Sequence, residues 1–157
     1  FNTIGSAQDG GWASNYENKL FCHKDEYSDF ESELFKFSYL KHEANHFVDI
    51  EKYPNLSSAD LEYRSKLIEF MYSKSRTQAL VSNFINGASN ENRNNSHAYA
   101  NHTIISHLSE LIFGEAYVTD LSKWKTISNE QINKVAKQLY NQSDQHLSID
   151  TNIVEVI

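Results

Sequence analysis

Cysteine and proline are almost absent from this chain, which has one of each among its 157 residues. The single cysteine, Cys22, cannot form an intrachain disulfide, so a fold stapled by disulfides is excluded. Zinc sites rich in thiolates are excluded for the same reason, and any metal must be held by histidine and carboxylate groups. No apolar run approaches the length of a membrane span, and we recognise no signal peptide.

Positive charge is also scarce. The chain has 14 Lys and Arg residues and 21 Asp and Glu residues, which gives a net charge of −7. This balance argues against nucleic acid or an anionic membrane as the main partner. A hydrophobic content of 39% is typical of a globular protein, and the length fits one domain over residues 1–157. The chain begins with Phe1 rather than methionine, so it could be a piece of a longer protein. The sequence does not determine its compartment or its oligomeric state.

The motif HEANH, at residues 42–46, carries most of the chemistry in the sequence. Two histidines four residues apart on a helix project from one face, so His42 and His46 can bind a single Zn²⁺. Glu43 then lies beside the metal, where it can deprotonate a metal-bound water. This is the H-E-x-x-H arrangement of zinc peptidases.

The residues around the motif predict one long helix. Ser28 and Glu31 form a capping-box pattern, and apolar residues recur at helical spacing as far as Val48. Pro54 ends the pattern. We therefore expect the motif to lie near the end of a helix whose apolar stripe faces the core.

The rest of the chain is also predicted to be mainly helical. Residues 19–23 could form a short strand, and the tail at 145–157 could end in another. Residues 87–96, which include no large apolar side chain, are predicted to form a mobile loop. Further helices are expected from Ser57 or Ser58 onward, at 78–85, at 98–113 with Gly114 closing it, and after the cap Ser128.

A catalytic zinc needs a third protein ligand. The metzincin pattern fails, because Asp49 and Lys52 stand where it needs glycine and histidine. Glu62 follows His46 after fifteen residues, near the start of the next predicted helix, and an antiparallel helix pair would bring it back to the histidines. Asp60 and Glu69 are the alternative ligands.

This arrangement resembles the gluzincin-type zinc peptidases, in which a glutamate on the following helix completes HExxH. The resemblance covers residues 42–69 only, and Lys66 stands where those enzymes have an acidic residue one turn after the ligand. It implies a zincin-like α+β domain, mainly helical, with a ligand-bearing second helix and a small N-terminal sheet. The implied function is zinc-dependent hydrolysis of a peptide or protein substrate.

Other groups in the sequence could support this chemistry. His97 and Tyr99 directly follow the polar loop, and we expect them to stabilise the oxyanion of the scissile carbonyl. Asp49 could accept a hydrogen bond from His46 or could pair with Arg64. The alternatives to a peptidase are a non-catalytic helical interaction domain, an inactive peptidase-like domain, and a metal-dependent hydrolase of another kind.

Overall fold

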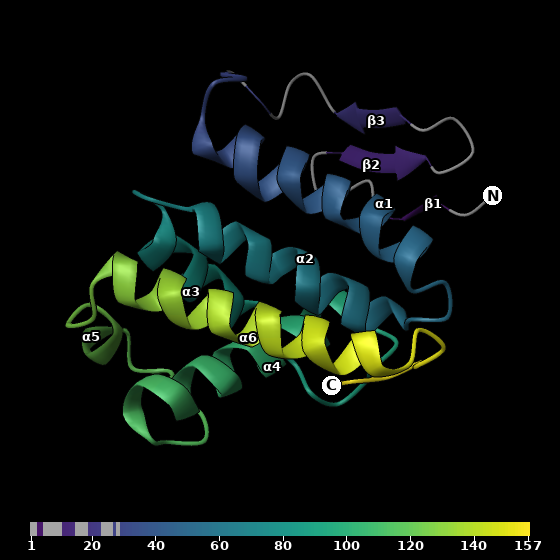
Figure 1. The fold of residues 1–157 in the computed structure, drawn as a ribbon. Coiled ribbons are helices and arrows are strands. Elements are labelled where there is room, and N and C mark those ends of the chain that lie inside the picture. Colours follow the sequence, from purple (N-terminus) through teal and green to yellow (C-terminus); the bar gives the residue numbers. More distant parts are fainter. Residues whose placement is uncertain (1–2, 5–10, 15–18, 23–26, 28) are drawn as a thin grey trace.

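The structure is a computed structural model that describes residues 3–4, 11–14, 19–22, 27 and 29–157. As expected, the described part of the chain is mainly helical (Figure 1). No helix in this part combines the length and the hydropathy needed to cross a bilayer. The elements, in chain order, are β1 (Thr3–Ile4), β2 (Gly11–Ser14), β3 (Lys19–Cys22), the π-helix η2 (Leu34–Lys41), α1 (His42–Lys52), α2 (Ser58–Tyr72), α3 (Thr77–Asn86), α4 (Ser96–Phe113), α5 (Leu121–Trp124) and α6 (Asn129–Ile149).

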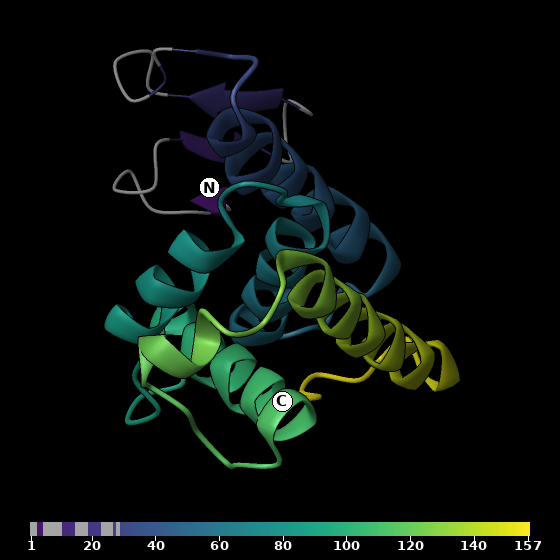
Figure 2. The same cartoon turned by 90° about the vertical axis from the view of Figure 1, so that its left-hand side faces the viewer.

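The three short strands pair antiparallel in the order β1-β2-β3, with Trp12 opposite Phe21. They lie beside η2 and α1, on the side away from α2 (Figures 1 and 2). The strand expected near residue 19 is β3, whereas β1 and β2 were not predicted as individual strands. The predicted strand end at His23 lies outside the described residues.

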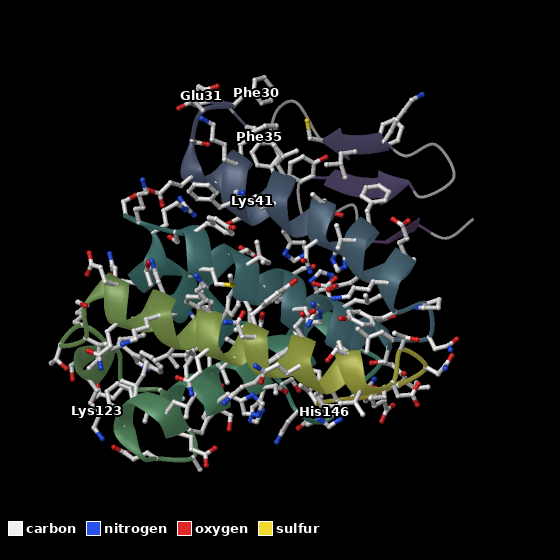
Figure 3. All side chains as sticks on the ribbon, in the orientation of Figure 1. Phe30, Glu31, Phe35, Lys41, Lys123 and His146 are labelled. Carbon is white, nitrogen blue, oxygen red and sulfur yellow. The ribbon has the colours of Figure 1, made fainter. Side chains whose placement is uncertain are left out.

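The predicted long helix around the motif is two elements, because π-helical turns at Leu34–Lys41 run directly into α1. Residue 28 lies outside the described residues, and Glu31 precedes the first turn. The hydroxyl of Ser32 accepts from the backbone N–H of Phe35 instead, at 3.2 Å. Phe35 also meets Phe30 edge to face at 4.8 Å, beside the start of η2 (Figure 3). We expected α-helical spacing throughout, because π turns are rare and occur mostly as single turns within α-helices.

The apolar stripe predicted to dock this helix is partly exposed. Leu40 and Val48 are 40% and 57% exposed. The buried side of α1 is polar and consists of His42, Glu43, Asn45, His46 and Asp49. Burial of polar side chains requires partners for each of them, and α2 supplies most of those partners.

Helix α2 is the centre of the fold, since it packs against α1, α4 and α6 (Figure 2). Of the two candidate caps, Ser57 is the N-cap, and its hydroxyl accepts from the backbone N–H of Asp60. The helix is buried on nearly all sides and includes five ionisable side chains with little exposure: Asp60, Glu62, Arg64, Lys66 and Glu69. A helix buried in this way cannot be identified from an amphipathic pattern.

The main core joins α2, α3, α4, α5 and α6, with fully buried Leu67, Ile105, Trp124 and Ile132 among its members. The sequence located Ser128, which caps α6, and Gly114, which ends α4 with a φ of 69°. Helix α6 continues to Ile149, and no strand forms in residues 150–157.

The tail is held by a side chain rather than by a neighbouring strand. The backbone N–H groups of Val156 and Ile157 donate to Oδ1 of Asp60, at 2.9 and 3.0 Å. Asp60 also accepts from Ser57 and from Arg93. Asp60 is therefore occupied with the tail and the loop, and takes no part in the cluster of groups around His42.

Candidate metal centre

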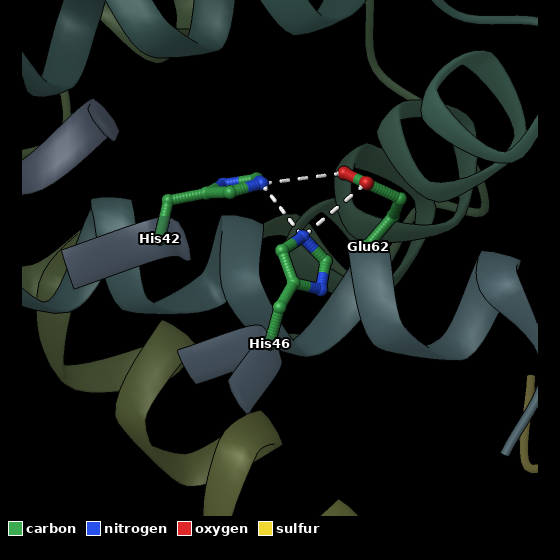
Figure 4. Close-up of side chains that lie close together, drawn as sticks. All are labelled: His42, His46 and Glu62. Carbon is green, nitrogen blue, oxygen red and sulfur yellow. Dashed lines mark hydrogen bonds and ion pairs between the residues drawn. The ribbon is translucent and has the colours of Figure 1, made fainter. Parts of the chain in front are cut away.

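Three buried side chains from two helices converge at one point (Figure 4). His42 and His46 project from α1, with their Nε2 atoms 3.1 Å apart. Glu62 approaches from α2, with Oε2 at 3.4 Å from Nε2 of His42 and Oε1 at 3.3 Å from Nε2 of His46. The antiparallel pairing of α1 with α2 produces this meeting, and Glu62 rather than Asp60 or Glu69 is the carboxylate that reaches both imidazoles.

These separations fit a zinc ion. Tetrahedral zinc with bonds of about 2.0–2.1 Å places its donor atoms about 3.3–3.4 Å from one another. The three observed separations are 3.1, 3.3 and 3.4 Å. His42, His46 and Glu62 therefore form a donor set of suitable type and spacing for a metal.

Glu69 fixes the orientation of the first histidine. Nδ1 of His42 donates to Oε1 of Glu69 at 2.9 Å, and this leaves Nε2 to face Glu62. A carboxylate on the far nitrogen of a metal-binding histidine sets its tautomer and makes it a stronger ligand. Glu69 lies seven residues beyond Glu62 on α2, so one helix supplies both the carboxylate among the donors and the one that holds His42. In the described part of the chain, Nδ1 of His46 has no comparable partner.

The cluster shares positive charge unevenly. Burial lowers the pKa of His42, but its contacts with Glu62 and Glu69 outweigh this and raise it to about 10. Burial also lowers the pKa of His46, and this effect outweighs the opposing contact with Glu62, so the pKa stays below its ordinary value. Burial would raise the pKa of Glu62, yet the two imidazoles hold it well below its usual value. One proton on His42 thus sits where a cation would bind, and metal binding must release it.

Of the two roles considered for Asp49, the structure shows the pairing with Arg64. Nε of Arg64 lies 2.7 Å from Oδ2 of Asp49, and Nη2 lies 3.0 Å from Oδ1. Asn45 donates to the same carboxylate at 2.8 Å and to Ser65 at 3.2 Å, and it accepts from Tyr140 at 2.9 Å. These bonds link α1, α2 and α6 directly behind the three donors.

Glu43 is 4% exposed and follows His42 on the polar side of α1. Tyr39 lies one turn before it, on η2, and is 3% exposed. Burial raises the pKa of Tyr39, and the charges of Cys22 and Glu43 raise it further. Tyr39 is therefore a neutral phenol beside Glu43, a neighbour that the sequence did not indicate.

The two proposed oxyanion donors lie in different places. Nδ1 of His97, at the first turn of α4, lies 3.3 Å from Oε2 of Glu62, and its side chain is 32% exposed. Tyr99 lies two residues further, and its ring packs on the guanidinium of Arg93, 5.1 Å from the centroid. Among the described residues Tyr99 makes no contact with the three donors, so its predicted role gains no support, whereas His97 lies at the cluster.

The loop at 87–96 is held more firmly than its composition suggested. Arg93 donates to Ser57 at 3.0 Å, to Asp60 at 2.5 Å and to the carbonyl of Ile157. The lack of large apolar side chains in the loop does not reveal this charged group, which joins the loop to α2 and the tail. The mobility of the loop stays a prediction.

Comparison with protein-family models, with curated proteins and with solved structures found no match for this chain. The class of this site is therefore defined by its own geometry: a buried His-His-Glu donor set, with Glu43 next to it. The likeness to gluzincin-type peptidases stays a resemblance in motif and ligand order.

Proposed function

We propose that this protein is a zinc-dependent peptidase in which His42, His46 and Glu62 hold the metal. The single observation that carries the proposal is the approach of these donors from two helices to 3.1–3.4 Å of one another. A structural role would need only some polar contacts, whereas these separations match those of a metal's ligands. When bound, zinc would polarise a carbonyl and lower the pKa of water.

The chain's own groups then have distinct tasks. Glu43 accepts a proton from the attacking water and passes it to the leaving amine. Tyr39 keeps a neutral hydroxyl one turn from Glu43. His97, which contacts Glu62 and is partly exposed, is placed to donate to the oxyanion of the scissile carbonyl. Glu69 and the Asp49–Arg64 pair hold α1 and α2 in the alignment that the donors need.

Metal content is the first test. The protein, purified without added metal, should contain close to one zinc per chain by elemental analysis. His42→Ala, His46→Ala and Glu62→Ala should each lose most of it, because two remaining donors bind zinc weakly. His146→Ala is the matched control, since His146 is exposed on α6 (Figure 3). Full zinc content in all three variants would refute the site.

Hydrolysis is the second test. Glu43→Gln preserves the shape of the side chain but cannot accept a proton, so it should keep zinc and reduce the hydrolysis of a mixed peptide library by at least a hundredfold. Loss of zinc in this variant would make Glu43 a ligand instead. Zinc binding without hydrolysis of any peptide by the unaltered protein would favour the inactive or non-catalytic alternative.

A further inference from the structure

A buried lysine lies beside the candidate metal centre. Lys66 is 8% exposed and follows Glu62 by one helical turn on α2. Residues at i, i+4 and i+7 share one side of a helix, so Glu62, Lys66 and Glu69 project in the same general direction. Nζ of Lys66 lies 4.9 Å from the ring centroid of Phe84 on α3. The ammonium therefore lies against α3, while the Cα of Lys66 is one helical turn from that of Glu62.

This ammonium has no anionic partner in the described part of the chain. The two neighbouring glutamates are directed elsewhere, because Glu62 contacts His42, His46 and His97, and Glu69 contacts His42. The described contact of Lys66 is the face of Phe84, a cation–π interaction. The other strongly buried cation of α2, Arg64, is paired with Asp49 through two hydrogen bonds.

Withdrawing an ammonium from water is costly unless a counter-charge replaces the water. A cation–π contact replaces only part of that hydration. Lysine is a compact, strongly hydrated charge with three donors, well suited to binding a carboxylate that arrives from outside. Lys66 lies one helical turn from a proposed metal ligand, Glu62. We therefore expect the carboxylate that it binds to be part of a substrate held at the metal centre.

We propose that Lys66 binds a carboxylate of the substrate and thereby directs the enzyme to peptides with a free carboxylate close to the scissile bond. The proposal rests on the proposed peptidase function for its substrate. The carboxylate can come from a peptide C-terminus or from an Asp or Glu side chain, since Nζ would form the same charged hydrogen bonds with either.

The test measures binding rather than turnover. Zinc-loaded Glu43→Gln protein is titrated calorimetrically with acetyl-Ala-Ala, with acetyl-Ala-Ala amide and with acetyl-Asp-Ala amide. We expect one of the two carboxylate peptides to bind about ten- to a hundredfold more tightly than the neutral peptide, the gain typical of a charged hydrogen bond. The tighter one identifies the source as terminus or side chain.

The same titrations with Lys66 replaced assign the effect. Lys66→Met in the Glu43→Gln background should abolish the preference and leave the affinity for the neutral peptide unchanged, whereas Lys66→Arg should retain part of it. Lys125→Met, at an exposed position, is the control. Circular dichroism and zinc content establish that each variant is folded and loaded.

Two results would overturn the proposal: no preference for either carboxylate peptide, or a preference that survives Lys66→Met. In the second case the zinc itself binds the carboxylate. If Lys66 only balances Glu62 and Glu69, its replacement should tighten zinc binding and leave peptide affinities alone. Failure of the unaltered protein to hydrolyse peptides would refute the proposed function but not a carboxylate preference that depends on Lys66.

Discussion

Oε1 of Glu69 accepts from Nδ1 of His42 at 2.9 Å, so that a carboxylate two turns beyond Glu62 orients the first histidine of the motif. The two glutamates of α2 thus have different roles. Glu62 is one of the three proposed metal donors, whereas Glu69 holds the imidazole of His42 from its other side. The sequence had offered Glu69 only as a substitute ligand. From this position Glu69 fixes which nitrogen of His42 faces Glu62.

Glu69→Gln should weaken zinc binding about 10- to 100-fold, the usual effect of removing a carboxylate that supports a metal ligand. The amide still fills the space, so the fold should persist. Competition with a chelator measures the affinity. Glu51→Gln, at an exposed position on α1, is the control and should bind zinc normally. An unchanged affinity in Glu69→Gln would show that the contact does not support the site.

Asp49→Ala should destabilise the protein by about 3–5 kcal/mol, because it leaves the guanidinium of Arg64 buried without its main counter-charge. Both side chains are 1% exposed. Urea unfolding of the metal-free protein measures the change. Lys123→Gln breaks the exposed pair with Glu115 and should alter stability by no more than about 1 kcal/mol. Equal effects from the two substitutions would contradict the buried role of Asp49.

His107 should make the protein less stable in mild acid. Burial lowers the pKa of His107, although Glu110 opposes this, and the hydroxyl of Tyr63 donates to its Nδ1 at 3.0 Å. The unfolded chain therefore binds a proton more readily, and the stability contributed by neutral His107 is lost as pH falls below about 6.5. Relative to His107→Gln, the protein should lose up to about 1.4 kcal/mol of stability per pH unit there.

Urea unfolding of both proteins at pH 7.5 and pH 5.5, with chelator present, measures this difference. The chelator removes the effect of acid on metal binding. A constant difference in stability between the two proteins across these pH values would show that His107 keeps its ordinary pKa.

Arg93→Gln should loosen both the loop at 87–96 and the tail, since Arg93 joins them to Ser57 and Asp60. We expect backbone amides of the two segments to exchange hydrogen about 10- to 100-fold faster, as the loss of charged hydrogen bonds implies. Lys137→Gln, at an exposed position on α6, should leave exchange unaltered. Rapid loop exchange already in the unaltered protein would show that these bonds do not hold the loop, and would support its predicted mobility.

Local features whose physical cause lies within a few residues could be predicted from the sequence. His42 and His46 share one side of a helix because they are four residues apart, Ser57 and Ser128 cap helices with their own hydroxyls, and Gly114 ends one by adopting a positive φ. The short link between α1 and α2 was sufficient to predict that Glu62 would return to the histidines.

Tertiary structure decided which side of each helix is buried and what each charge contacts. The apolar spacing of the motif helix predicted a core-facing stripe that included Val48 and either Leu40 or the stem of Lys41. Leu40 and Val48 are exposed instead, and the polar side of α1 is buried against α2. Only the packed structure supplies partners for buried polar groups, so only it could show that Asp49 pairs with Arg64 and that Glu69 supports His42. Charge pairing depends on distances between helices, which the sequence does not give. Only the packed structure could therefore show that Lys66 is buried one turn from Glu62, with the ring of Phe84 as its described contact.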